Sequence, residues 1–297
     1  MTEASIPVDL LNPGQVFACL GLVEATDILL GDVEGVFDWS NPADVRFRLR
    51  TPGIESPLLH VLQFIDQAKA IATAPAHSTT LEKWNKSWGP APEEADDTSY
   101  PFPDPSSPAT LVCVLTDGSR RIAIDHWGDE TNRDNVKFWA GAGGYPGAAL
   151  ARDALVSIGG RASGAIDDPF GFQALQSSSF RLDWRRDYIP LDAGFSLNAH
   201  DKIVTVGYPL VELLGAIGLT HSRPCRPKRR DKLQYLYGVV GRAQAEENFW
   251  LPPSILRAGL GTTEIAFPSR RFRMLLGWPG KENQARSITT VTEETMS

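Results

Sequence analysis

Long apolar runs are largely missing from this sequence. No stretch approaches the roughly 20 apolar residues that a membrane-spanning helix requires. The first residues, MTEASIPVDLL, have no positive region ahead of an apolar stretch, so they do not resemble a secretory signal. We therefore expect no contact with a membrane and a cytoplasmic location.

Cysteine and histidine are both scarce. The three cysteines, Cys19, Cys113 and Cys225, lie far apart, which argues against disulfides and against a cysteine zinc site. None of the five histidines has another histidine four residues away, and the sequence has neither a G-x-S-x-G motif nor a cysteine-nucleophile signature. We expect a protein that is not an enzyme and that needs no metal and no cofactor.

The overall composition is that of a globular chain with one unusual interruption. With 297 residues, 42% of them hydrophobic, the chain can bury a core and lies near the length at which one core divides. Residues 75–108 contain seven prolines, six acids and only two lysines, which favours an exposed loop. The expected parts are an N-terminal α+β part (1–74), the acidic proline-rich loop (75–108), a main α+β part (109–280) and a polar tail (281–297).

Hydrophobic periodicity and turn residues predict an α+β fold with mixed or antiparallel sheets and packed helices. Strands come in runs rather than each being followed by a helix, so a doubly wound parallel sheet is disfavoured, and the chain forms one elaborated domain or two tightly packed subdomains. Helices are predicted at 13–30, 56–74, 146–160, 208–219 and 251–261. Strands are predicted at 33–39, 45–51, 109–117, 120–127, 135–141, 179–188, 231–240 and 262–278.

Positive charge is concentrated in HSRPCRPKRRDK, residues 221–232, although the formal net charge of the chain is -7. The cluster has a single acid, Asp231, against Arg223, Arg226, Lys228, Arg229, Arg230 and Lys232. Like charges held together cost free energy unless they meet an anion, and nucleic acid is the commonest cellular polyanion. We predict that these six side chains bind nucleic acid.

Two further arginine clusters contain aromatic residues. One surrounds Trp184 in SFRLDWRRD, and the other surrounds Phe272 in PSRRFRMLL. Both patterns fit solvated strand faces, and both also fit a groove in which guanidinium groups grip phosphates and rings stack on bases. Three basic clusters together favour the second interpretation, which adds these candidate nucleic-acid contacts: Arg185, Arg186, Arg270, Arg271 and Arg273.

Other motifs carry weaker signals. The glycine-rich turn in KFWAGAGGYPGAALARDAL precedes a helix, but it lacks the spacing of a phosphate-binding loop, so a turn that packs a strand on a helix is the better interpretation. His126 lies near three acids, Asp125, Asp129 and Glu130, which leaves a cryptic metal-dependent nuclease as an alternative. Trp84 and Trp88 in LEKWNKSWG share one face of a predicted short helix that docks on the body or on a partner.

Four blocks of the sequence, in order, resemble a CRISPR-associated family of subtype I-U, also called I-G. The family is the short large-subunit-type component of a Cascade-like effector complex. The blocks are NPGQVFACLGLVEATD (12–27), IDHWGDETNRDNVKFWAG (124–141), FRLDWRRDYIPLDAGFS (180–196) and GYPLVELLGAIGLTHSRP (207–224). The chain departs from the family pattern after W-A-G, where Ala142 and Gly143 stand in place of a glutamine pair.

The resemblance implies a subunit without a catalytic motif. Proteins of this type lie near the 5′ end of the guide, contact the motif that flanks the target, help to open the duplex and recruit the helicase-nuclease. Base pairing selects the target in such complexes, while protein holds the backbones. The implied partners are other effector subunits, guide RNA, target DNA and the helicase-nuclease. A RAMP-like backbone subunit that binds guide RNA along its length remains an alternative.

Overall fold

Helices and strands are both prominent in the computed structural model, which describes residues 1–53, 55–95, 105, 107–127, 145–176, 178–185, 206–228, 231, 233–244, 248–277 and 287–294. This part of the chain forms a six-stranded sheet, a four-stranded sheet, a two-stranded sheet and five α-helices. The predicted α+β fold with mixed and antiparallel sheets is therefore confirmed.

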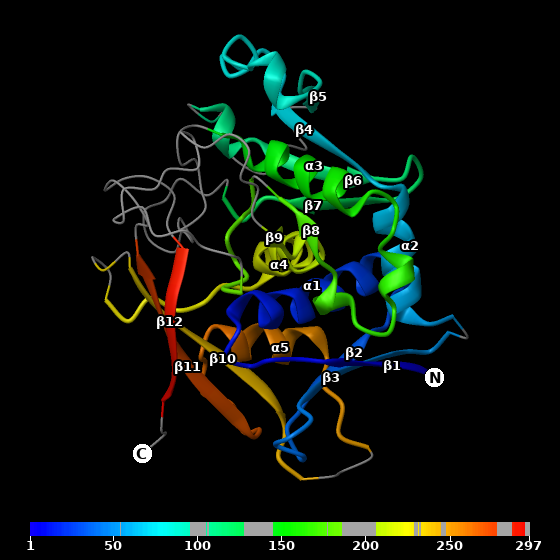
Figure 1. Cartoon of the computed structure of the whole chain (residues 1–297), viewed down its shortest axis with the longest axis vertical. Helices are drawn as coiled ribbons and strands as arrows, with labels where there is room; N and C mark the ends of the chain where they lie inside the picture. Colours follow the sequence, from blue (N-terminus) through cyan, green and yellow to red (C-terminus); the bar gives the residue numbers. More distant parts are fainter. Residues whose placement is uncertain are drawn as a thin grey trace.

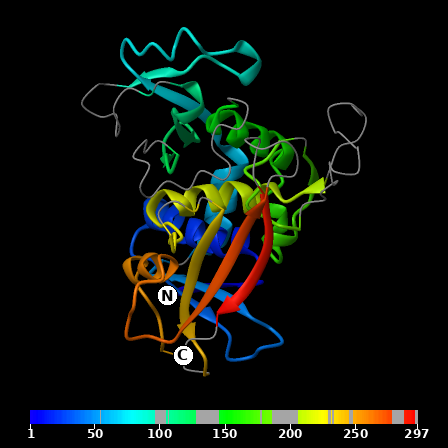
Figure 2. The ribbon, with the colours of Figure 1, turned by 90° about the vertical axis from the view of Figure 1, so that its left-hand side faces the viewer.

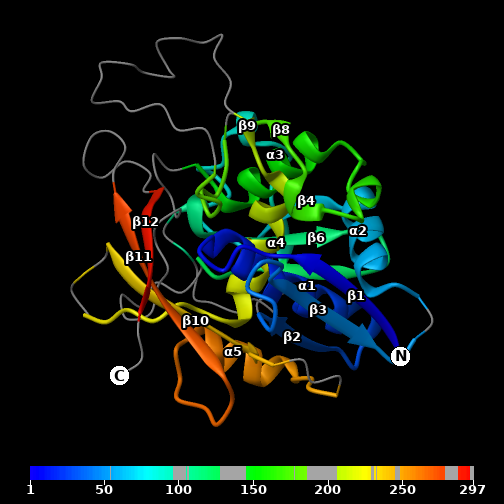
Figure 3. The same cartoon turned by 60° about the horizontal axis from the view of Figure 1, so that its bottom comes forward.

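The six-stranded sheet joins both ends of the chain (Figures 2 and 3). Its order is β1-β3-β2-β10-β11-β12, and all neighbours are antiparallel except β2 and β10, which are parallel. The strands are β1 (Thr2–Pro7), β2 (Glu34–Asp38), β3 (Arg46–Thr51), β10 (Gln234–Arg242), β11 (Ser269–Gly277) and β12 (Ser287–Glu294). On β3, Phe47 and Leu49 are buried and alternate with arginines on the outer face, as the two-residue repeat of a strand requires.

The four-stranded sheet has the order β5-β4-β6-β7. Its strands are β4 (Lys69–Pro75), β5 (Glu93–Ala95), β6 (Val112–Thr116) and β7 (Arg121–Ile124). β6 and β7 are joined by a tight turn, in which Gly118 has a φ of 99° that favours glycine. Two short strands, β8 (Ala174–Leu175) and β9 (Val206–Gly207), form a separate antiparallel pair.

Two helices lie between the larger sheets (Figure 1). These are α1 (Pro13–Leu30) and α4 (Pro209–His221); α1 contacts β3 on one side and α4 contacts β7 on the other. Helix α2 (Pro57–Gln67) packs on α1 and β1, α3 (Gly147–Ile158) on β4 and β6, and α5 (Pro253–Leu260) on β10. One continuous hydrophobic core connects these layers.

The middle position explains the sequence of α1. Every residue from Pro13 to Thr26 is buried, because no side of this part of the helix faces solvent. A helix with apolar residues on all sides is typical of such a site. In contrast to the expectation from the sequence, α1 is by length and composition apolar enough to cross a membrane, but 78% of it is buried inside the protein.

The contact between α1 and α4 depends on glycines where the two backbones meet. A Cβ atom at Gly21 would lie 1.9 Å from the carbonyl oxygen of Leu214, and one at Gly218 would lie 2.2 Å from that of Phe17. Both obstacles are backbone atoms, which cannot rotate away. Only glycine therefore permits this crossing.

Several sequence-based boundaries are wrong. The helix predicted to reach residue 74 ends at Gln67, and β4 follows because its residues pair with β6. Within the strand predicted at 179–188, the described residues 179–185 form no strand. The prediction of a polar tail is wrong over Ser287–Glu294, which form β12. The strands of residues 1–74 pair with later strands in both sheets, so these residues do not form a separate part. The strand predicted at 135–141 lies outside the described residues.

We predict that Gly21→Ala lowers the free energy of unfolding by about 3 kcal/mol, since the added methyl group forces the two helix backbones apart. Chemical denaturation of the purified protein measures the loss. Gly164→Ala is the matched control, because a Cβ atom there meets no heavy atom within 4 Å, and its effect should stay below about 1 kcal/mol. Equal stability of the two variants would contradict the close helix crossing.

Candidate nucleic-acid interface

The basic cluster is built as a hairpin that leaves the body after α4. Cys225 and Leu236 exchange two backbone hydrogen bonds, of 2.7 and 2.8 Å, which fix the base of the hairpin to β10. We call residues 223–235 the basic hairpin. Because a reciprocal pair of backbone bonds holds its base, the direction in which it leaves the protein is set by the sheet.

The tip of the basic hairpin contains the one acid of the cluster. The N–H of Asp231 donates to the carbonyl of Lys228 at 3.0 Å, and the Asp231 carboxylate accepts from the N–H of Leu233 at 2.9 Å. This carboxylate therefore shapes the turn. Lys228 is exposed and Arg226 is partly exposed, whereas Arg229, Arg230 and Lys232 lie outside the described residues.

An ionic cluster around one buried carboxylate supports the start of the basic hairpin. Glu24 of α1 is 2% exposed and accepts two hydrogen bonds of 2.6 Å from Arg257 of α5. The imidazole of His221, at the end of α4, lies 3.9 Å from the same carboxylate. Burial raises the pKa of the nearby Asp125, and the charges of His221 and Arg223 oppose that rise. Charged side chains of α1, α4, α5 and the segment after β7 thus meet where the basic hairpin begins.

His126 lies inside the core rather than on a reactive surface. Its side chain is fully buried and packs against Trp127, with ring centroids 4.7 Å apart. Burial, helped by the charge of Arg223, lowers its pKa from 6.5 to about 3, so the imidazole is neutral at physiological pH. Asp125 and His126 are adjacent in the sequence, but the burial of the imidazole keeps it out of reach of a dissolved substrate.

The other two residues of the nuclease hypothesis, Asp129 and Glu130, lie outside the described residues. Within the part of the chain that the structure describes, no group of three or more histidine, cysteine, aspartate and glutamate side chains is placed to hold a metal ion. A metal site built around His126 therefore finds no support among these residues.

We predict that acid destabilises the protein through His126. Between pH 6.5 and 3 the unfolded chain binds a proton at this side chain that the folded chain does not, so stability is complete above pH 6.5 and is lost as pH falls. From pH 6.5 to 5 the loss should be about 1.5 kcal/mol. Denaturation at each pH measures this slope, which His126→Phe should reduce.

Exposed His77 provides the matched control, and His77→Asn should leave the slope unchanged. Comparing slopes between variants cancels the carboxylates that titrate in the same range, including Asp125. An unaltered slope in His126→Phe would contradict the buried neutral imidazole.

The arginines of β11 do not form one patch. Phe272 is fully buried, with Arg270 on the core side of the strand and Arg271 and Arg273 on the opposite side. Arg271 and Arg273 share a face, and Arg270 lies apart from them because strand residues alternate. Arg271 donates to the carbonyl of Thr262 at 3.3 Å.

Strand β12 supplies carboxylates to these arginines. Arg270 donates two hydrogen bonds of 2.6 Å to Glu293, and Arg273 pairs with Glu294. The pairing raises the pKa of Arg270 and lowers that of Glu293. Because acids of the predicted tail neutralise them, these arginines present less net charge to a phosphate than their sequence cluster indicates.

Arg185 serves the fold. Its guanidinium donates to both oxygens of Asp183 at 2.6 to 3.2 Å and to the carbonyl of Phe170 at 2.7 Å, and it lies 3.7 Å from the ring centre of Tyr208. Asp183 is 2% exposed and also accepts from Asn12, the cap of α1. Arg185 therefore has a structural role, and the nucleic-acid contact predicted for it stays a prediction; Arg186 lies outside the described residues.

A second carboxylate explains why this segment is not a strand. Glu212, in the first turn of α4, is 1% exposed and accepts hydrogen bonds of 3.1 to 3.2 Å from the backbone N–H groups of Leu182 and Asp183. These donors would otherwise pair with a neighbouring strand. Contacts with α4 therefore override the local strand preference.

Sequence reasoning missed an arginine row on β3. Arg46, Arg48 and Arg50 share the outer face, and the guanidinium of Arg50 lies 4.4 Å from the ring centre of Trp250. The alternation in RFRLRT was the available signal. Asp44, Glu3 and Glu34 pair with the three arginines in turn, so this face is balanced in charge.

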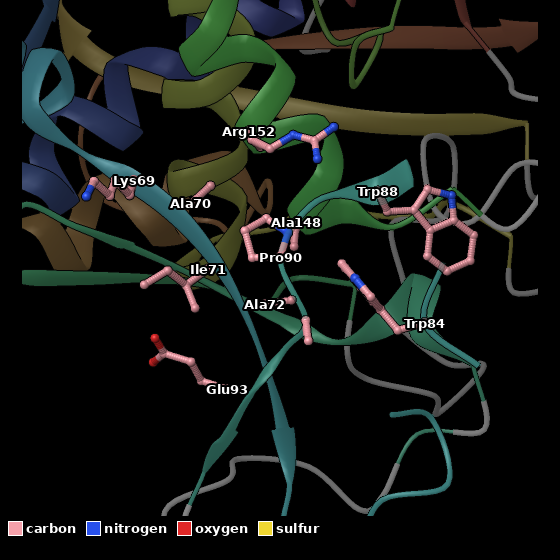
Figure 4. A pocket seen from close by; sticks show the side chains of 11 residues that line it. Lys69, Ala70, Ile71, Ala72, Trp84, Trp88, Pro90, Glu93, Ala148 and Arg152 are labelled. Atoms are coloured by element: carbon pink, nitrogen blue, oxygen red, sulfur yellow. The ribbon is translucent and has the colours of Figure 1, made fainter. Parts of the chain in front are cut away.

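Trp84 and Trp88 lie together beside a cavity of about 240 Å³ (Figure 4). Their ring centroids are 5.4 Å apart in an edge-to-face arrangement, and the Trp84 indole N–H donates to the carbonyl of Gly89 at 3.3 Å. Trp88 ends a single 3₁₀ turn, Lys86–Trp88, instead of sharing an α-helix with Trp84. Both rings are partly buried against the body.

The described part of the glycine-rich segment supports the packing interpretation. A Cβ atom at Gly147, the first residue of α3, would lie 2.6 Å from the ring of Trp127. This glycine therefore allows the start of the helix to pack against the core. Residues 128–144, which hold the remaining glycines, lie outside the described residues.

Comparison of the chain with protein-family models, with curated proteins and with solved structures finds no match in any of the three. The resemblance to the CRISPR-associated family therefore stays a prediction from the four sequence blocks.

Proposed function

We propose that this chain is a non-catalytic subunit of a cytoplasmic type I CRISPR RNA-guided surveillance complex, and that it contacts nucleic acid through the basic hairpin. The observation that carries the proposal is that hairpin: a cationic segment anchored to β10, with its one acid used in the turn. Target DNA and guide RNA share the phosphate backbone that such a surface binds.

Charge pairing supports the basic hairpin as the main contact. Arginines elsewhere on the surface face carboxylates at close range, as Arg270 does with Glu293 and Arg50 with Glu34. An arginine held by a carboxylate must lose that partner before it can bind a phosphate. The segment 221–232 has one acid among its twelve residues, and that acid, Asp231, is used in the turn.

The four sequence blocks support the more specific role. A large-subunit-type component would contact the motif that flanks the target and recruit the helicase-nuclease that cuts. Arginine is the usual partner of guanine in the major groove, while phosphate contacts position the protein without selecting bases. The basic hairpin contains both arginine and lysine and suits either kind of contact.

The buried position of His126 supports a role without catalysis, because a general base must reach the proton that it removes. Asp125 near it contributes to the ionic cluster at the start of the basic hairpin. In this proposal Asp125 helps to position the nucleic-acid contact.

We predict that replacing Arg226, Lys228, Arg229 and Arg230 together with alanine weakens duplex-DNA binding and its dependence on salt. Each lost phosphate contact should reduce the slope of log K against log salt by about 0.9. Fluorescence anisotropy with a labelled duplex, between about 50 and 200 mM salt, measures the slope. The melting temperature should stay nearly unchanged, since substitutions outside the hydrophobic core usually change stability little.

Lys83 and Lys86 provide a control for general charge loss. Both are exposed in the segment between β4 and β5, outside the basic hairpin, and their joint replacement with alanine should leave the salt slope nearly unchanged. A quadruple variant with the wild-type slope would refute the proposed contact. Weakening confined to one flanking sequence would indicate direct base contacts instead.

We also predict that co-expression with the proteins encoded beside it and a guide precursor yields a complex that contains this chain and guide RNA. Native mass spectrometry of that complex gives the copy number: one copy agrees with a large-subunit-type component, and several copies agree with a RAMP-like backbone subunit. Recovery of the chain solely as a free monomer from such cells would contradict the subunit proposal.

A further inference from the structure

The four-stranded sheet has an incomplete outer strand. β5 pairs with β4 only at Thr73↔Glu93, Ala74↔Glu94 and Pro75↔Ala95, whereas β6 pairs with β4 from Lys69 to Thr73 on the other edge. Within the described residues, no strand is paired with the outer edge of β4 between Lys69 and Ala72. A row of backbone donors and acceptors therefore runs past the end of β5.

Two prolines explain why β5 begins only at Glu93 and does not extend along β4 toward Lys69. Pro90 and Pro92 come directly before β5 in the parallel direction, and proline has no N–H with which to extend the ladder. The chain therefore diverges from β4 at this point. The cavity of about 240 Å³ lies in the resulting space, with Lys69, Ala70, Ile71 and Ala72 among its lining residues.

Most of the remaining lining is apolar or aromatic. Ala148 of α3 lies at the cavity with Trp84, Trp88 and Pro90, and Figure 4 shows the two indoles on the side opposite Lys69. Small apolar residues on one wall and rings on another make a pocket for an apolar side chain. Because the pocket adjoins an open strand edge, backbone and side chain of one ligand can be bound together.

Charges mark the two ends of this groove. Lys69 is exposed at the start of β4, and Glu93 is exposed opposite Thr73, four residues further along. The third charge of the lining, Arg152, already pairs with Asp153 at 2.8 Å. A ligand that satisfies both ends therefore carries a negative group near Lys69 and a positive group near Glu93.

We propose that the β4 edge binds an extended peptide segment of a partner protein, which adds a strand beside Lys69–Ala72 and inserts an apolar side chain between Trp84, Trp88 and Pro90. Open strand edges recruit peptides in this way, with main-chain bonds providing affinity and pockets providing specificity. The guest segment continues the row that β5 begins. It carries an acidic residue and a basic residue about four positions apart, with the apolar residue between them.

The proposal builds on the subunit role proposed above, because an assembled subunit needs a docking site for its neighbours. It concerns a different surface from the basic hairpin. The quadruple alanine variant of that hairpin should therefore keep peptide binding, and a blocked β4 edge should keep the salt slope of DNA binding.

Selection of random ten-residue peptides displayed on phage against the full chain tests the site. Selected peptides should share an apolar residue between an acidic and a basic residue. The dissociation constant of synthetic copies should be at least tenfold higher for the Ala91→Trp variant than for the wild type. Ala91 lines the cavity and is exposed, so the indole fills the pocket without entering the core. Ala43→Trp, at an exposed position in another turn, is the matched control and should bind as the wild type does.

Hydrogen exchange shows whether the peptide adds a strand. Bound peptide should slow amide exchange in the fragment that contains Lys69–Ala72 by tenfold or more, and Lys69→Glu should change the preferred neighbouring residue from acidic to basic. Failure to select a peptide, equal binding to Ala91→Trp, or unchanged exchange at Lys69–Ala72 would each overturn the proposal. Unchanged melting temperatures of the variants would show that these outcomes concern the site rather than folding.

Discussion

The close crossing of α1 and α4 is the constraint on which the other contacts depend. With glycine at Gly21 and Gly218, the two helices form a thin middle layer that both larger sheets can pack against. The position of α4 then sets where Glu212 binds the segment around Leu182 and where the basic hairpin begins. A wider crossing would move both. The close packing at two glycines thus determines, through the position of α4, where the segment of the proposed nucleic-acid contact begins.

Acids within the fold hold several arginines of this acidic chain, as Glu24 holds Arg257 and Asp183 holds Arg185. The basic hairpin has a single acid within its own sequence, Asp231, and that acid shapes the turn. The net charge of a whole chain does not determine the charge of one surface, so a net charge of -7 is compatible with the proposed anion-binding surface.

Local signals predicted the elements whose cause is local. The helix predicted at 13–30 is α1 (Pro13–Leu30), which begins after its cap Asn12, and the strand predicted at 45–51 overlaps β3 (Arg46–Thr51). Sequence reasoning failed where distant segments decide. β4 is a strand because it pairs with β6, and the carboxylates that neutralise arginines of β11 belong to β12. Within the described residues, the edge of β4 beside Lys69–Ala72 is unpaired because β5 pairs with β4 only from Thr73 onward, and the sequence of β4 alone does not show this.

The parallel pairing of β2 with β10 has a consequence for how the chain is made. Arg242 and Asp38, which form an ion pair where these strands meet, are 204 residues apart in the sequence. During synthesis, β1 to β3 have one unpaired sheet edge, at β2, until β10 has left the ribosome. Non-local pairing of this kind slows folding and exposes strand edges to other chains. Completion of the six-stranded sheet is thus tied to the synthesis of β10, and a nascent chain that stalls before β10 keeps the edge of β2 open to other chains.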